Sequence, residues 1–218
     1  MKTLSFTQEY YLCAINDRGN LPVLDTEIAT CLLAGGIMEL TQQGYLSYDE
    51  KKRFVVAKPW DDALPYLKPL YDQVASFKKP QKIDGVVAAY EASLQAPLPD
   101  LLSALGTSLA AAGYAEELNE QGLLHNKTRY APKPEAVTRS IEKIRAEFLE
   151  DGTISDETLC LAALLDGSHL IKRYFSKVEA GALKERLKEL RESEAYASVR
   201  EFLDSAAGAL AAIVIAAV

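Results

Sequence analysis

Apolar residues recur at helical spacing along most of the chain. Val137, Ile141, Ile144 and Phe148 follow an i, i+4, i+7, i+11 pattern, which places them on one face of a helix. The stretch from Asp25 to Gln43 is apolar nearly all round, as expected of a buried helix. The run 159–165 is wholly apolar and is also expected to be buried. The pattern therefore predicts a mainly α-helical protein.

Capping and breaking residues set the ends of the predicted helices. Ser5 followed by Gln8 can form a capping box, and Gly44 is placed to end the second helix. Ser155 can cap the apolar run that Asp166-Gly167-Ser168 then breaks. The predicted helices cover about residues 5–16, 25–43, 64–76, 83–94, 100–119, 134–150 and 155–166, an amphipathic segment around 183–190, and an apolar C-terminal helix.

Two short hairpins interrupt the helical pattern. Residues 45–48 and 53–56 form the arms of the first, and residues 123–125 and 128–130 form those of the second, with Asn126-Lys127 at its tip. No repeat period or low-complexity linker separates one part of the chain from another. We therefore expect a mainly α fold: a single compact helical-bundle domain over residues 1–218 with one or two short β-hairpins.

The two ends of the chain bear on membrane topology and location. Residues 206–218 carry no charge, but these 13 residues fall short of the ~20 that a membrane-spanning helix needs. They are therefore expected to form a buried core helix. The first residues lack the apolar segment of a signal peptide, so a cytoplasmic protein is expected.

The amino-acid composition limits the chemical functions that the chain could have. The chain has 24 Lys plus Arg against 31 Asp plus Glu, a net charge of -7, which disfavours nucleic-acid binding because that binding relies on phosphate neutralisation. Its three cysteines (Cys13, Cys31 and Cys160) lie in apolar stretches without metal-site spacing and are expected to be buried free thiols. Ser168-His169 is interpreted as a capping serine beside a packed histidine. We expect no catalytic residue, metal or cofactor.

The order of elements resembles a known family. Residues 4–20, LSFTQEYYLCAINDRGN, are similar to the opening of the Golgi phosphoprotein 3 family, which has an apolar helix followed by an Asp-x-x-Gly turn. Residues 37–46, IMELTQQGYL, match the Glu-Leu-x-x-x-Gly-x-Leu step that ends the family's buried second helix. Residues 118–124, LNEQGLL, loosely match a later step before a hairpin. The resemblance extends over nearly the whole chain.

The resemblance implies a mostly helical, non-enzymatic domain. Eukaryotic members are peripheral membrane proteins that bind phosphatidylinositol 4-phosphate and act as adaptors for Golgi glycosyltransferases. Their lipid pocket uses a Trp and several Arg residues, and the positions that align with them here are Leu24, Leu33, Ser108 and Ala111. Phosphate recognition needs Arg, Lys or a free helix N-terminus. The chain is therefore expected to resemble a prokaryotic-type member that keeps the fold, with the pocket arginines replaced.

Both hairpins carry candidate contact residues. Lys51, Lys52 and Arg53 form the densest basic cluster, which fits either a solvated hairpin tip or a contact with an anionic surface. The second hairpin combines basic and apolar residues that could dip into a bilayer interface, dock a protein or simply pack on the domain. These residues are Leu123, Leu124, Lys127, Arg129 and Tyr130.

Three functions compete at this stage. The leading hypothesis is a peripheral-membrane adaptor that binds anionic phospholipid. The second is a protein-interaction or self-associating module, a possible homo-oligomer, that contacts partners through residues 123–130. The third is a winged-helix nucleic-acid binder with Lys51, Lys52 and Arg53 on its wing, which the acidic net charge disfavours.

Overall fold

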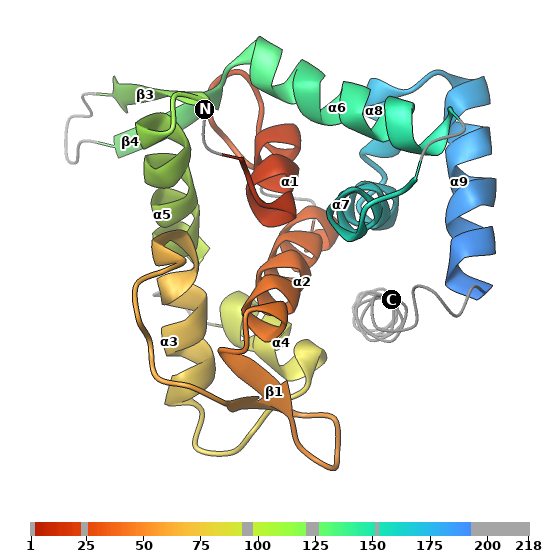
Figure 1. Ribbon diagram of the computed structural model, residues 1–218. Coiled ribbons are helices and arrows are strands. Elements are labelled where there is room, and N and C mark those ends of the chain that lie inside the picture. Colours follow the sequence, from red (N-terminus) through yellow and green to blue (C-terminus); the bar gives the residue numbers. More distant parts are fainter. Residues whose placement is uncertain (1–2, 23–25, 93–97, 121–126, 151–152, 193–218) are drawn as a thin grey trace.

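The computed structural model describes residues 3–22, 26–92, 98–120, 127–150 and 153–192 (Figure 1). Its helices are α1 (Phe6–Ala14), α2 (Thr26–Gln42), η1 (Pro65–Leu67), α3 (Lys68–Ser76), α4 (Ile83–Ala92), α5 (Leu98–Ala111), α6 (Pro134–Phe148), α7 (Asp156–Gly167), α8 (Ile171–Tyr174) and α9 (Lys177–Glu192). The strands are β1 (Leu46–Tyr48), β2 (Phe54–Val56), β3 (Ala115–Glu120) and β4 (Lys127–Pro132). The prediction of a mainly α-helical fold with one or two short hairpins is confirmed.

The core forms around three helices that contact one another. α1, α2 and α7 pack together in the middle of the fold, with α6 and α9 outside them (Figure 1). Residues 31–40 of α2 are all buried, as the all-round apolar pattern predicted. All three cysteines are buried and free, which confirms their predicted packing role.

Capping residues and a glycine in the sequence predicted several helix ends correctly. The Ser5 hydroxyl accepts a hydrogen bond from the Gln8 backbone N–H, and the Gln8 side-chain oxygen accepts one from the Ser5 backbone N–H, so the predicted capping box is present. Gly44 ends the turn after α2 with a φ of +74°, a conformation that glycine adopts at no steric cost. Ser155 caps α7 as predicted.

One predicted helix is too long. The sequence predicts helix over 100–119, whereas α5 ends at Ala111 and residues 115–120 form β3. Gly113, with a φ of +84°, terminates the helix, and the backbone of β3 then pairs with β4. Pairing with a strand further along the chain outweighs the local helical propensity of this Ala- and Glu-containing segment.

The two hairpins occupy opposite ends of a layer formed by α5 and α3 (Figure 1). β1 and β2 pair antiparallel, with Leu46 opposite Val56, and β2 contacts α3. β3 and β4 also pair antiparallel, and both strands contact α5. The predicted C-terminal helix over 206–218 lies outside the described residues.

Candidate functional site

The turn of the first hairpin is organised by one carboxylate. Asp49 accepts hydrogen bonds from the backbone N–H groups of Lys51 and Arg53, at 2.8 and 3.0 Å, and from the Arg53 guanidinium at 2.7 Å. These contacts with Arg53 lower the pKa of Asp49 to about 2. Arg53 is thus held by the turn, whereas Lys51 and Lys52 are exposed at the tip.

Apolar side chains are exposed beside these lysines. Tyr48 is 39% exposed and Val56 is 43% exposed, and they are two of the three exposed large hydrophobic residues in the described part of the chain. Because the fully buried Leu46 and Phe54 anchor the same strands in the core, the exposed pair is held at the surface by a fixed scaffold. The β1–β2 hairpin therefore presents apolar and cationic groups together.

A bridge to a distant segment adds further cations. The Phe54 backbone N–H donates to the Gln81 carbonyl at 2.8 Å, so residues around Gln81 extend the hairpin on the β2 side. Lys79 and Lys82, which flank Gln81, are exposed. We define the basic–apolar face as Tyr48, Lys51, Lys52, Val56, Lys79 and Lys82. Of these six residues, the sequence pattern predicted only Lys51 and Lys52.

An aromatic cluster supports this end of the molecule. The rings of Tyr45, Trp60 and Tyr71 contact one another, with centroid distances of 4.9 to 6.0 Å. The Lys58 ammonium group lies 3.9 Å from the Tyr45 ring centroid and pairs with Asp61 at 3.2 Å. The sequence contains no spacing signal for this cluster, because its members lie on separate elements.

The second hairpin is anchored by a buried aromatic residue. Tyr130 is only 7% exposed, and its hydroxyl lies 2.8 Å from that of Thr107 on α5. Its ring fills the space over Gly106, where an added Cβ would come within 2.0 Å of it. An added Cβ at Gly19 would lie 2.8 Å from the Tyr130 backbone. Tyr130 therefore packs inside the fold and does not form part of an exposed contact surface.

The pairing of β3 with β4 changes the chemistry expected of this hairpin. The predicted first arm, residues 123–125, is wrong: the partner of β4 is Ala115–Glu120. This strand carries Glu116 and Glu117, both exposed, and Glu120 stands opposite Lys127 in the register. Arg129 is half-buried. Acidic residues thus balance the basic ones along these strands. Leu123 and Leu124 lie outside the described residues, as does the side chain of Lys127.

The positions that align with the lipid pocket of the resembled family are uncharged. Ser108 and Ala111 line a pocket of about 760 Å³ between α5, α1 and the η1 turn, and none of the described residues around it is Lys or Arg. Gln8 donates to the Ser108 hydroxyl at 2.9 Å, which occupies one polar group there. Leu33 is buried in the core, at 1% exposure. Leu24 lies outside the described residues.

A buried carboxyl lies beside this pocket. Glu39 is 4% exposed and accepts a hydrogen bond from the hydroxyl of Tyr66, which lines the pocket. Burial raises the pKa of Glu39, because the charged form loses its hydration. Because no described lining residue is a cation, this pocket is an unfavourable place for a phosphate group.

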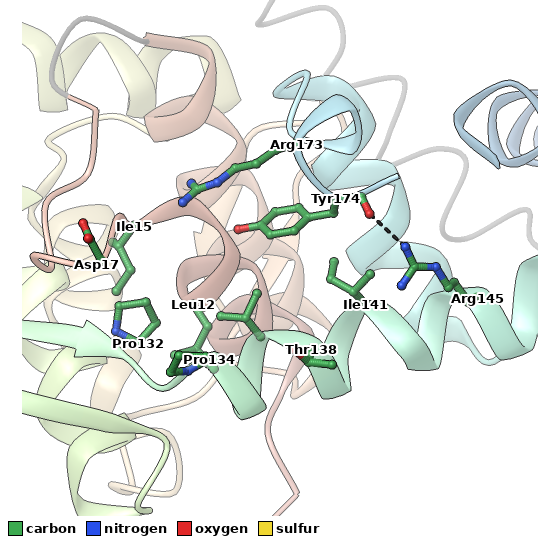
Figure 2. Close-up of a pocket in the computed structure, with 11 residues that line it drawn as sticks. Leu12, Ile15, Asp17, Pro132, Pro134, Thr138, Ile141, Arg145, Arg173 and Tyr174 are labelled. Carbon is green, nitrogen blue, oxygen red and sulfur yellow. Dashed lines mark hydrogen bonds between the residues drawn. The ribbon is translucent and has the colours of Figure 1, made fainter. Parts of the chain in front are cut away.

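A second pocket, of about 430 Å³, lies between the end of α1, the start of α6 and α8 (Figure 2). Leu12, Ile15, Val137 and Ile141 give it an apolar interior. Arg173, Arg145 and Asp17 supply its charged groups. The Tyr174 hydroxyl donates to the Cys13 carbonyl at 2.6 Å and so fixes α8 against the end of α1.

Groups capable of catalysis are dispersed or buried. Burial raises the pKa of the Cys13 and Cys160 thiols to about 12, which keeps them protonated at neutral pH. Ser168 is the C-cap of α7, but the prediction of a packed His169 is wrong: His169 is exposed and lies 3.4 Å from Glu27. Within the described ranges, no group of three or more His, Cys, Asp or Glu side chains could hold a metal ion.

No helix among the described residues combines the length and apolar character that crossing a bilayer requires.

Comparison with known proteins gives one clear match. The sequence model of the Golgi phosphoprotein 3 (GPP34) family matches residues 6–208. The match includes both hairpins and the helices between them. No curated protein matches the chain at a significant level.

Proposed function

The chain belongs to the Golgi phosphoprotein 3 family, and from this premise we propose that it is a non-enzymatic adaptor module that associates peripherally with anionic membrane surfaces. The observation that carries the proposal is the basic–apolar face of the β1–β2 hairpin. Exposed Tyr48 and Val56 lie on the strands that lead to Lys51 and Lys52. An aromatic and an aliphatic side chain flanked by lysines suit the boundary between lipid headgroups and acyl chains.

This contact would be electrostatic and would not select a particular headgroup. Each Lys near an anionic leaflet contributes about 1 kcal/mol of attraction, which falls off within a Debye length. None of the described residues that line the pocket over Ser108 and Ala111 is a cation that could pair with a phosphomonoester. We therefore expect the protein to respond to the charge density of a membrane and not to phosphoinositide as such.

Vesicle co-sedimentation tests the proposal. The vesicles contain phosphatidylcholine alone, or phosphatidylcholine with phosphatidylserine or phosphatidylinositol 4-phosphate at matched total charge. Binding is expected to both anionic compositions at similar strength, to weaken with added salt, and to be absent from the neutral vesicles. Binding that is equal on neutral and anionic vesicles, or absent from all three, would refute the membrane proposal.

Charge reversal tests whether the basic–apolar face makes the membrane contact. The double substitution Lys51→Glu/Lys52→Glu should weaken anionic-vesicle binding by more than about tenfold, since two attractive charges become repulsive. Lys177→Glu/Lys188→Glu on α9, also exposed, makes the same change in net charge and is the matched control. An equal loss in both variants would show that overall charge, and not this face, governs binding.

A protein-interaction or self-associating module is the second candidate function. β3 and β4 pair only with each other among the described strands, so each strand has an outer edge that could accept a strand from another chain. Light scattering at high protein concentration tests self-association. A mass above the 23.9 kDa of one chain is expected if the hairpins pair, and a mass of one chain at all concentrations contradicts it.

A further inference from the structure

The pocket between α1, α6 and α8 combines an apolar interior with a charged rim. Leu12, Ile15 and Ile141 are buried at its base, and Val137 is half-buried beside them. Its volume of about 430 Å³ falls in the range of about 300–1,000 Å³ that is typical of small-molecule sites. It is distinct from the uncharged pocket over Ser108, with which it shares no lining residue.

Arg173 extends over this pocket from α8 (Figure 2). Its guanidinium carbon lies 5.4 Å from the Tyr174 ring centroid, and one of its nitrogens donates to the Cys13 carbonyl at 3.5 Å, the outer limit of a hydrogen bond. Because the Tyr174 hydroxyl already donates to that carbonyl at 2.6 Å, the arginine contributes little there. A guanidinium has five N–H donors. Most of the donors of Arg173 are therefore available to a ligand.

The other charged groups at the pocket are less suited than Arg173 to bind an anion. Arg145 is held by Glu179 at 2.9 Å, by Glu142 at 2.7 Å and by the Tyr174 carbonyl at 2.9 Å, so each of its nitrogens has a partner. Asp17 is exposed at the rim, and its carboxylate would repel a bound anion. Of the two arginines, Arg173 is thus the one placed to receive an anionic group.

We propose that this pocket binds a single-chain amphiphile with an anionic head. The alkyl chain would lie against Val137 and the small accessible parts of Ile15 and Ile141, where it loses contact with water. The carboxylate or phosphate head would accept hydrogen bonds from the Arg173 guanidinium. The planar fork of arginine matches either head. This inference does not depend on the proposed membrane association, because it uses different residues and a ligand that is free in solution.

Calorimetric titration with eight-carbon ligands tests the chemistry. Octanoate, octyl phosphate, octanol and octylamine are each added below their micelle-forming concentrations, and acetate represents a head without a chain. Octanoate and octyl phosphate are expected to bind at least about tenfold more tightly than octanol, octylamine or acetate, because a charge-assisted hydrogen bond and chain burial must act together. Equal binding of octanoate and octylamine would overturn the assignment of an anionic head, and equal binding of acetate would overturn the role of the apolar interior.

Two substitutions of opposite effect locate the site. Arg173→Gln should reduce octanoate affinity about tenfold or more, whereas Lys172→Gln, an exposed neighbour that does not line the pocket, should leave it unchanged. Asp17→Asn should strengthen octanoate binding by a few-fold, because it removes a repulsive charge. Since Asp17 is exposed, this variant is expected to fold normally even if Arg173→Gln does not. Octanoate binding that is unaffected by both Arg173→Gln and Asp17→Asn would refute the proposal.

Discussion

The two hairpins of this protein have similar sequence signals but different surroundings. The β1–β2 hairpin buries Leu46 and Phe54 and leaves Tyr48, Val56 and two lysines at the surface. The β3–β4 hairpin buries its aromatic residue, Tyr130, and pairs its basic strand with an acidic one. A basic and apolar composition therefore does not define a contact surface by itself. The register of the strands and the side that packs on the body decide which groups reach solvent.

Truncating Tyr130 and Tyr48 should give the largest difference between the hairpins in the free energy of unfolding. Tyr130→Ala is expected to lower the free energy of unfolding by about 3 kcal/mol, because it empties a buried aromatic site against α5. Tyr48 of the other hairpin is 39% exposed and its ring contacts Phe54 at the edge of the core, so Tyr48→Ala should change the free energy of unfolding by about 1 kcal/mol. Urea denaturation monitored by circular dichroism measures both values. Equal losses would mean that the two hairpins are anchored alike.

Two glycines with left-handed backbone test the close approach of β4 to the body. Gly19 has a φ of +68°, and an added Cβ would lie 2.8 Å from backbone atoms of Tyr130. Gly19→Ala should therefore cost about 2 kcal/mol or more, from strain together with the clash. Gly44, with a φ of +74° before β1, has nothing within 4 Å of that position. Gly44→Ala should cost only the conformational strain, about 1 kcal/mol. Denaturation curves that coincide for the two variants would contradict the packing described for β4.

The pH response of the first hairpin should reflect the Asp49–Arg53 contact. The pKa of Asp49 is lowered from 3.8 to about 2, so its folded-state stabilisation is fully present above pH 3.8 and is lost as the pH falls toward 2. Carboxyl titration by NMR should find this low value. Arg53→Gln should raise it toward 3.8, because the main stabilising donor is removed. An Asp49 titration that is unchanged in Arg53→Gln would mean that the turn backbone alone lowers the pKa.

Much of the fold could be predicted from local signals, whereas only Lys51 and Lys52 of the candidate sites could be. The Ser5–Gln8 capping box, the buried second helix and the first hairpin follow from residues close in sequence. β3 was predicted as helix, because its propensity is helical and its partner strand is distant. The bridge between Phe54 and Gln81, which brings Lys79 and Lys82 to the first hairpin, has no sequence signal. The same holds for the pocket of Figure 2, whose lining comes from α1, α6 and α8.

The central claim is that the β1–β2 hairpin, and not the β3–β4 hairpin, contacts an anionic bilayer. An environment-sensitive fluorophore attached at Glu50→Cys or at Glu116→Cys compares the two hairpins, and both substitutions remove one exposed glutamate. The native cysteines are buried, so the label should react at the introduced thiol. On phosphatidylserine vesicles, a blue shift is predicted for the label at position 50 and none for the label at position 116. A blue shift at position 116 alone, or at neither position while the protein sediments with the vesicles, would contradict the account.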